Sequence, residues 1–255
     1  MTQAVAWPLA LGLLGAIFGS FIAALVIRWP EGRSVLRGRS ACDTCRRTLR
    51  AGELVPLLSF VVQRGRCRGC GATIDPRHWA IELAAAAIGI AAGLAAPDAS
   101  GVSGAVFGWL LLALAALDLA AFWLPDRLTG LLAATGLMGG LAAGWAAMEP
   151  PLADRVIGGV AGYASLAAIA WGYKVLRHRE GLGGGDPKLL GAIGLWLGWR
   201  MLPAVVVIAS LVGLGVVLVA RLTGRPMARD TAMPFGTLLA VAAYPAWLAM
   251  VLLGP

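Results

Sequence analysis

Long apolar segments separated by short polar stretches make up most of this chain. A helix needs about 20 apolar residues to cross the hydrocarbon core of a bilayer. None of the segments alternates strictly like a barrel strand, and a backbone in lipid must satisfy its own hydrogen bonds, so helices are favoured. The pattern gives eight candidate spans, at residues 4–27, 79–96, 102–124, 128–148, 156–176, 189–199, 203–222 and 235–253. The sixth is short, so it is either a broken or tilted span or part of the seventh.

Composition supports a membrane protein. Of the 255 residues, 59% are hydrophobic and 13% are charged, whereas soluble domains contain about 25% charged residues. Abundant Gly and Ala are typical of helices that approach one another closely in a membrane. The sequence therefore predicts an all-α, polytopic bundle. Three regions are expected: a first transmembrane helix at 1–28, a loop domain at 29–78 and a transmembrane core at 79–255.

The net charge of +8 is explained better by membrane orientation than by nucleic acid, which we do not expect as a partner. Nineteen Lys and Arg residues lie on one predicted side of the membrane, eleven of them within residues 28–78, against only two on the other. Positive charge in short loops marks the cytoplasmic side. We therefore expect an inner-membrane protein with its N-terminus outside and the 29–78 loop in the cytoplasm, where the basic loop could also bind anionic lipid.

All four cysteines lie in that loop, as two Cys-x-x-Cys pairs: Cys42 with Cys45, and Cys67 with Cys70. Two such pairs are typical of a structural zinc site, in which four thiolates close a tetrahedron. Two disulfides, or free thiols, are the alternative. Because disulfides rarely persist in the cytosol, zinc is favoured, and four thiolates would leave no open position for catalysis.

Three carboxylates stand out at the predicted cytoplasmic ends of spans. Asp118 lies inside an apolar segment, where a charge costs about 2.5–3.5 kcal/mol or more and marks a candidate functional site. Asp186 follows a run of glycines that includes Gly183 and Gly185. Asp126 has a good structural explanation as an acid in the first turn of a helix.

If Asp118 and Asp186 are neighbours, one proton is shared between them, and the pair can act as base and acid in the manner of an aspartic protease. Glycines would let a substrate backbone or a helix approach Asp186 closely. Lys188 could keep the Asp186 carboxylate ionised, or could extend toward the lipid head groups. The rival interpretation is a transporter or proton relay, since acids within a membrane also mark such pathways.

Six ordered blocks resemble the bacterial type IV prepilin peptidases, or leader peptidase/N-methyltransferases. These blocks are "GLLGAIFGSFIAALVIRWP", the paired cysteine segments "CDTCRRTLRAGELVPLLSF" and "GRCRGCGATI", "IEL", "LDLAAFWLPDRLT", "GLGGGDPKLLGAIGLWLGW" and "MPFGTLLA". The resemblance implies a membrane aspartic endopeptidase that removes the basic leader of type IV prepilins or pseudopilins at the cytoplasmic face. It assigns the catalytic roles to Asp118 and Asp186, with Asp126 as part of the motif.

Many members of that family also methylate the new N-terminus with S-adenosylmethionine, an activity associated with the cysteine domain and the first loop. Two departures concern this half: Ala23 stands where the family commonly has Asn, and "RHWAIE" at 77–82 lacks the usual Pro. Glu82 is a candidate for the methyl-donor pocket. It could equally cap the base of the cysteine loop or pair with an arginine there, which we favour slightly.

Overall fold

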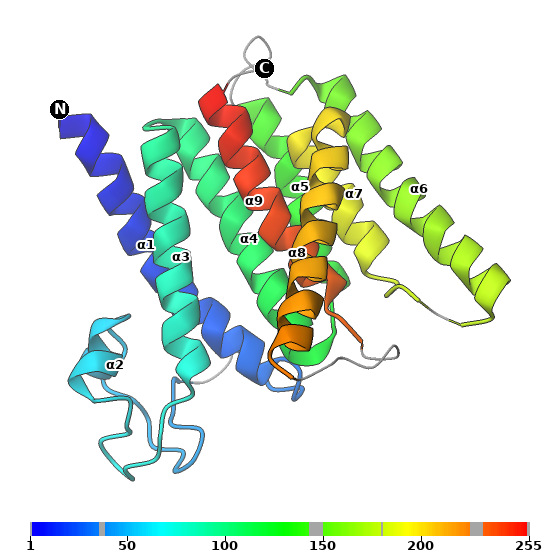
Figure 1. The fold of residues 1–255 in the computed structure, drawn as a ribbon. Coiled ribbons are helices and arrows are strands. Elements are labelled where there is room, and N and C mark those ends of the chain that lie inside the picture. The colour runs from blue at the N-terminus through cyan, green and yellow to red at the C-terminus, as the bar shows by residue number, and fades with distance from the viewer. Residues whose placement is uncertain (1, 36–38, 143–149, 180, 225–231, 254–255) are drawn as a thin grey trace. The chain divides into compact units, whose positions relative to one another are not determined.

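The computed structural model describes the chain except residues 1, 36–38, 143–149, 180, 225–231 and 254–255 (Figure 1). Its helices are α1 (Thr2–Arg28), α2 (Leu58–Val62), α3 (Pro76–Ala95), α4 (Ala99–Ala121), α5 (Asp126–Ala142), α6 (Leu152–Arg177), α7 (Asp186–Leu197), α8 (Leu202–Leu222) and α9 (Phe235–Leu253), with short 3₁₀ turns η1 (Ala51–Glu53) and η2 (Trp199–Met201). The described residues contain no strand, only two isolated bridges. The all-α prediction is confirmed.

The expected number of eight spans needs correction. Among the described residues, six helices are long and apolar enough to cross a membrane: α1, α3, α4, α6, α8 and α9. By contrast, α7 has only 12 residues and α5 has 17, and residues 143–148 of the fourth predicted segment lie outside the described part of the chain. Nor does α7 merge with α8, because Gly198 turns the backbone with a φ of 71°. An apolar composition marks a segment, but it does not fix the length of one continuous helix.

The chain forms two compact units, residues 1–113 and 114–255. In the first unit α1 and α3 pack side by side (Figure 1). Their backbones approach at glycines: a Cβ on Gly19 would lie 2.7 Å from Cα of Glu82, and one on Gly93 would lie 2.6 Å from N of Pro8. The abundance of small residues thus produces close helix contact, as expected.

The second unit is built around α7, which packs against α5, α6 and α9. Ten of its residues are buried. Glycines again bring two backbones together: a Cβ on Gly158 of α6 would lie 2.5 Å from the carbonyl oxygen of Gly194, and one on Gly162 would lie 2.7 Å from that of Leu190. The close packing fixes α7 and, with it, the acid at its first residue.

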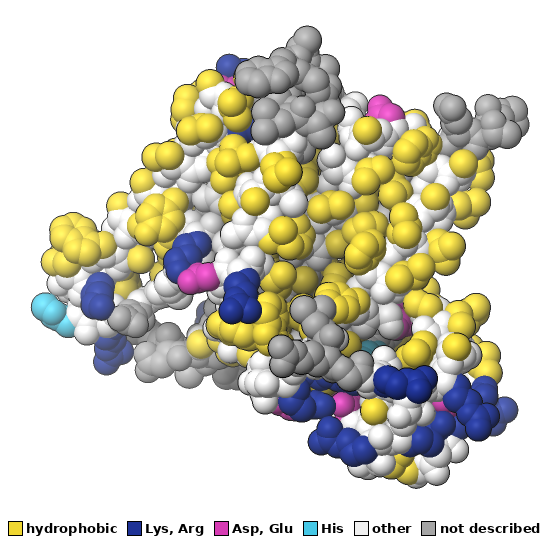
Figure 2. All heavy atoms as spheres, turned by 180° about the vertical axis from the view of Figure 1, so that it is seen from behind, with side chains coloured by type: hydrophobic (Ala, Val, Ile, Leu, Met, Phe, Trp, Pro, Cys, Tyr) yellow, Lys and Arg dark blue, Asp and Glu magenta, His cyan; other side chains and the backbone are white. Residues whose placement is uncertain are grey.

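Apolar and basic side chains occupy different parts of the surface in Figure 2. Hydrophobic side chains cover much of the helical surface, whereas Lys and Arg side chains gather over the segment between α1 and α3. Exposed apolar residues such as Leu9 of α1, Val160 of α6 and Leu214 of α8 are at least 63% accessible. Such faces suit contact with lipid, as an integral membrane protein requires.

Candidate active site

Asp118 lies near the end of α4 and is only 5% exposed. The helix ends at Ala121, earlier than the apolar pattern indicates, because Phe122 adopts a positive φ of 50°. Oδ2 of Asp118 accepts two hydrogen bonds from Thr237 in the first turn of α9, from the backbone N–H at 2.7 Å and from the hydroxyl at 3.1 Å. Asp118 therefore sits at the end of its span, with one oxygen held by a residue more than a hundred positions away.

Asp186 is the first residue of α7 and is 6% exposed. Its Oδ2 accepts a hydrogen bond from the backbone N–H of Gly183 at 3.1 Å. A Cβ on Gly183 would lie 3.1 Å from that same oxygen, and a Cβ on Gly185 would lie 2.8 Å from Cβ of Leu124. Glycine is thus favoured at both positions because a side chain would have no room there. Neither residue has a left-handed backbone conformation.

Gly236 is the point at which the two acids converge. A Cβ built on Gly236 would lie 3.1 Å from Oδ2 of Asp118 and 3.2 Å from Oδ1 of Asp186. The two carboxylate oxygens are therefore separated by no more than the sum of these distances, although their residues are far apart in the sequence. At any separation within that limit, one water molecule or one peptide carbonyl oxygen could contact both acids.

Asp126 and Lys188 form a separate pair at the same end of these helices. Nζ of Lys188 lies 2.6 Å from Oδ1 of Asp126, and both side chains are largely exposed. Lys188 thus pairs with Asp126 and, in the part of the chain that the structure describes, not with Asp186. The pair links the first turn of α5 to the first turn of α7, and an exposed pair of this kind contributes only about 0–1 kcal/mol.

Buried carboxylates this close to each other do not ionise together, because the second charge would be placed beside the first in a poorly solvated site. A pair in that state holds one acid and one base, and it can activate water while it protonates a carbonyl oxygen. Sequence reasoning missed Thr237 and Gly236. Their segment is one of the blocks that resemble the family, but a single Thr or Gly carries no chemical signal of its own.

In the first unit, Glu82 of α3 is 7% exposed. Its Oε2 accepts the backbone N–H of Leu57 at 2.7 Å, across the base of the cysteine segment. Leu57 has a φ of 61° and precedes α2. Through this hydrogen bond, Glu82 caps a backbone N–H group at the base of the cysteine loop.

The four cysteine sulfurs lie within 4.8 Å of one another. Four sulfurs around one zinc at about 2.3 Å would lie about 3.8 Å apart, and those of Cys42 and Cys70 are 4.0 Å apart. All four cysteines are free, and the 4.0 Å between the sulfurs of Cys42 and Cys70 is far longer than an S–S bond of about 2.05 Å. The cluster therefore has the composition and the size to hold one tetrahedral metal ion.

The two Cys-x-x-Cys pairs have the same local fold. A bridge joins Ala41 to Thr48 around the first pair, and another joins Arg66 to Thr73 around the second. Backbone N–H groups point at the sulfurs in such turns: those of Cys70 and Gly69 lower the pKa of the Cys67 thiol to about 6. A thiol that loses its proton easily is a ready metal ligand.

The fold and these sites define a polytopic helical membrane protein with a buried pair of aspartates and a segment whose four clustered cysteines could hold a metal ion. Residues 13–95 match the family described as the Bacterial Peptidase A24 N-terminal domain, and residues 105–218 match the Type IV leader peptidase family. The chain belongs to the type IV leader peptidase family, as the resemblance in its sequence implied.

Several curated relatives carry the name prepilin leader peptidase/N-methyltransferase. The one from Burkholderia pseudomallei strain K96243 is 46% identical over 89% of this chain and 81% of its own length. That from Dickeya chrysanthemi is 39% identical, covering 92% of this chain and 90% of the relative, and that from Aeromonas hydrophila is 40% identical, covering 83% and 71%. No solved structure matches the chain.

Proposed function

We propose that this chain is an aspartic endopeptidase that removes the leader of type IV prepilins or pseudopilins at the cytoplasmic face of the inner membrane. The observation that carries the proposal is the convergence of Asp118 and Asp186 on Gly236. Membership of the leader peptidase family supplies the substrate class. We further propose that the chain methylates the new N-terminus with S-adenosylmethionine, as the names of its relatives indicate.

Asp118 and Asp186 take different roles in this proposal. Hydrogen bonds donated to a carboxylate favour its charged form, and Thr237 donates through both its N–H and its hydroxyl to Asp118. Asp186 accepts backbone N–H groups, from Gly183 and Gly236, but, among the described residues, no side-chain hydroxyl. We assign to Asp118 the role of the base that takes a proton from water. Asp186 is the acid that protonates the carbonyl oxygen of the scissile peptide as the water oxygen bonds to its carbon.

The proposed orientation brings the substrate to these acids. Most Lys and Arg residues lie on the predicted cytoplasmic side, which is the side of the end of α4 and the starts of α7 and α9. A prepilin with its apolar segment in the bilayer and its basic leader in the cytosol would present the bond between them at that level. No metal is required for this step.

The direct test combines the purified chain, a full-length prepilin and a radiolabelled methyl donor. We expect a shortened pilin that carries one labelled methyl group at its N-terminus. Uncut prepilin after prolonged incubation with well-folded protein would contradict the peptidase assignment. Cleaved pilin without label would contradict the methylation assignment alone.

Thr237→Val is expected to lower kcat for leader cleavage about tenfold, with a smaller change in KM. The substitution keeps the backbone N–H contact but removes a hydroxyl that is shared between Asp118 and the carbonyl of Ala115. A hydrogen bond to a charged group contributes about 1.5–3 kcal/mol, and the sharing places the effect at the low end. Steady-state kinetics on detergent-solubilised prepilin would measure the change.

Thr237→Ser is the matched control, since serine retains the hydroxyl and should recover most of the activity. If the Thr237 hydroxyl positions Asp118, Thr237→Ser must be more active than Thr237→Val. Equal kcat values for Thr237→Val and the unaltered chain would show that the hydroxyl does not act on Asp118.

We propose zinc as the metal of the cysteine cluster. The supporting features are four cysteine sulfurs within 4.8 Å of one another and the expected cytosolic location, where disulfides are rare. A segment of this size has little apolar core of its own, so a metal ion that joins the two Cys-x-x-Cys turns would contribute much of its stability.

Cys45→Ser is expected to lower the zinc content from one ion per chain to less than about a tenth of that, because a serine hydroxyl remains protonated and is a poor ligand for zinc. Metal analysis of the purified protein measures this. Cys45→His offers an imidazole nitrogen that zinc accepts, so it should retain more metal than Cys45→Ser. Full zinc occupancy in Cys45→Ser would contradict the four-cysteine site.

A further inference from the structure

The first unit contains a cavity that the peptidase reaction does not use. It has a volume of about 370 Å³, within the range of about 300–1,000 Å³ typical of small-molecule sites. The end of α1, the start of α3 and the cysteine segment enclose it, and Cys42 and Cys67 form part of its wall. A cavity of this size beside the cysteine segment is large enough for a nucleoside derivative.

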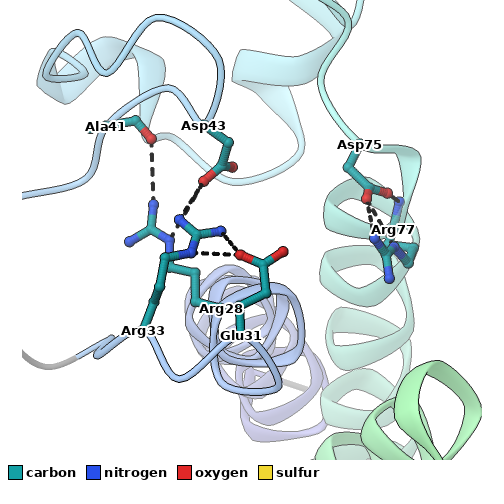
Figure 3. A network of polar contacts seen from close by, with 7 residues as sticks. All are labelled: Arg28, Glu31, Arg33, Ala41, Asp43, Asp75 and Arg77. Carbon is teal, nitrogen blue, oxygen red and sulfur yellow. Dashed lines mark hydrogen bonds and ion pairs between the residues drawn. The ribbon is translucent and has the colours of Figure 1, made fainter.

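Most charged groups around the cavity already have partners. Arg33 lies 2.6 Å from Glu31 and 3.1 Å from Asp43, and Asp75 pairs with Arg77 at 2.6 Å (Figure 3). These pairs make a polar wall whose charges are largely balanced. They do not by themselves select a ligand.

Glu82 differs from the other acids of the cavity. Only 7% of its surface is exposed, and it lines the cavity. Oε2 accepts the N–H of Leu57, while Oε1 has no hydrogen bond to any residue that the structure describes. This oxygen is open to the cavity, where a carboxylate attracts a cation or a hydrogen-bond donor, so the cavity suits a ligand with a positive centre.

Two further features fit the remainder of such a ligand. The rings of Phe60 and Trp79, whose centroids are 6.2 Å apart, both line the cavity and offer a surface on which a planar base can stack. Arg28 is held only loosely: it donates one long hydrogen bond to the carbonyl of Ala41 at 3.4 Å, and its Nε lies 3.9 Å from Oδ1 of Asp43 (Figure 3). Because a guanidinium has five N–H donors, Arg28 has donors left for a carboxylate.

We propose that this cavity binds the adenosyl sulfonium methyl donor, with the Glu82 carboxylate facing the sulfonium, the Phe60 and Trp79 rings against the adenine and Arg28 on the donor's carboxylate. The proposal rests on the methylation half of the proposed function. It also gives Glu82 a second role, since one oxygen caps Leu57 while the other meets the ligand.

The test measures binding of S-adenosylmethionine and of its neutral product S-adenosylhomocysteine to the purified full chain by calorimetry. Glu82→Gln keeps an oxygen for the Leu57 N–H but removes the charge. We expect it to weaken S-adenosylmethionine binding tenfold or more and to weaken S-adenosylhomocysteine binding much less. Equal losses for the two ligands, or no loss, would overturn the assignment of Glu82.

Ala24→Leu tests the cavity independently of the charge, because Ala24 lines it and a larger side chain would occupy ligand space. We expect both ligands to lose tenfold or more in affinity, and unchanged binding would overturn the cavity as the donor site. Asp98→Asn is the control: Asp98 is an exposed acid of the same unit outside the cavity, and Asn preserves its contact with the N–H of Ser100. Unfolding temperatures of all three variants check that they are folded.

The wild-type chain separates this inference from the proposed function. If it methylates pilin while Ala24→Leu binds the donor normally, only the cavity assignment fails. If the wild-type chain cleaves leader but neither binds the donor nor methylates, the methylation half of the proposed function fails together with this inference.

Discussion

Asp118→Asn and Asp186→Asn should each lower the rate of leader cleavage by about a thousandfold or more. General acid and base catalysis contribute about 10²–10⁴-fold each, and an amide can neither take a proton from water nor give one at neutral pH. Asn has nearly the size of Asp, so the buried site should keep its packing. Conversion of a full-length prepilin, followed by mass spectrometry of the shortened product, measures the effect.

Asp154→Asn is a matched control within the same unit. Asp154 lies in the first turn of α6 beside Trp199 and Arg200, at the opposite ends of the helices from Asp118, and it makes no part of the proposed site. It should cleave at nearly the normal rate. Normal cleavage by either Asp118→Asn or Asp186→Asn would overturn the catalytic assignment.

The same variants distinguish the peptidase from a proton relay. A relay would appear as proton flux through the reconstituted chain, and that flux would disappear in Asp118→Asn and Asp186→Asn. We expect no such flux in the unaltered chain, because its two buried acids meet each other at one end of their helices. Flux that depends on both acids, without leader cleavage, would favour transport.

Gly236→Ala should lower leader cleavage about a hundredfold while the protein stays folded. The added methyl group would lie 2.8 Å from Cδ1 of Leu124 and within 3.2 Å of a carboxylate oxygen of each acid. It would occupy the space between the two acids and push them apart. A displacement of about 1 Å in a catalytic constellation can cost about 10²-fold, and kcat for the same prepilin measures it.

Gly130→Ala is the control for this substitution. Gly130 lies on α5, and a Cβ there would meet nothing within 4 Å. Replacing an exposed helical glycine with alanine favours the helix by about 1 kcal/mol, so activity should be kept and stability should rise slightly. If Gly236→Ala were as active as Gly130→Ala, the acids could not enclose the reacting group at Gly236.

The membrane helices illustrate what an apolar pattern can and cannot predict. Segments 203–222 and 235–253 were expected as spans, and α8 and α9 have nearly these bounds. The pattern placed the sixth segment at 189–199, whereas α7 begins at Asp186 and includes Pro187 in its first turn. Hydrophobicity locates the buried part of a helix, but the first turn depends on capping and on contacts with other helices.

The candidate site divides in the same way. Asp118 could be identified because a charge in an apolar segment is costly, and Asp186 because it follows a run of glycines. Gly236 is one of 35 glycines, and Thr237 has an ordinary hydroxyl, so neither stands out. Their role depends on α9 beginning beside α4 and α7, which is a long-range contact that no local pattern encodes.

The sequence by itself determined the helical membrane class, the four candidate metal ligands and the two unusual acids, because each depends on residue type and local spacing. Only the tertiary structure decided that the acids meet at Gly236, that Lys188 pairs with Asp126 and that Glu82 lines a cavity. Those outcomes depend on how closely the helices pack, and glycines at α1 with α3 and at α6 with α7 set that distance through backbone contact.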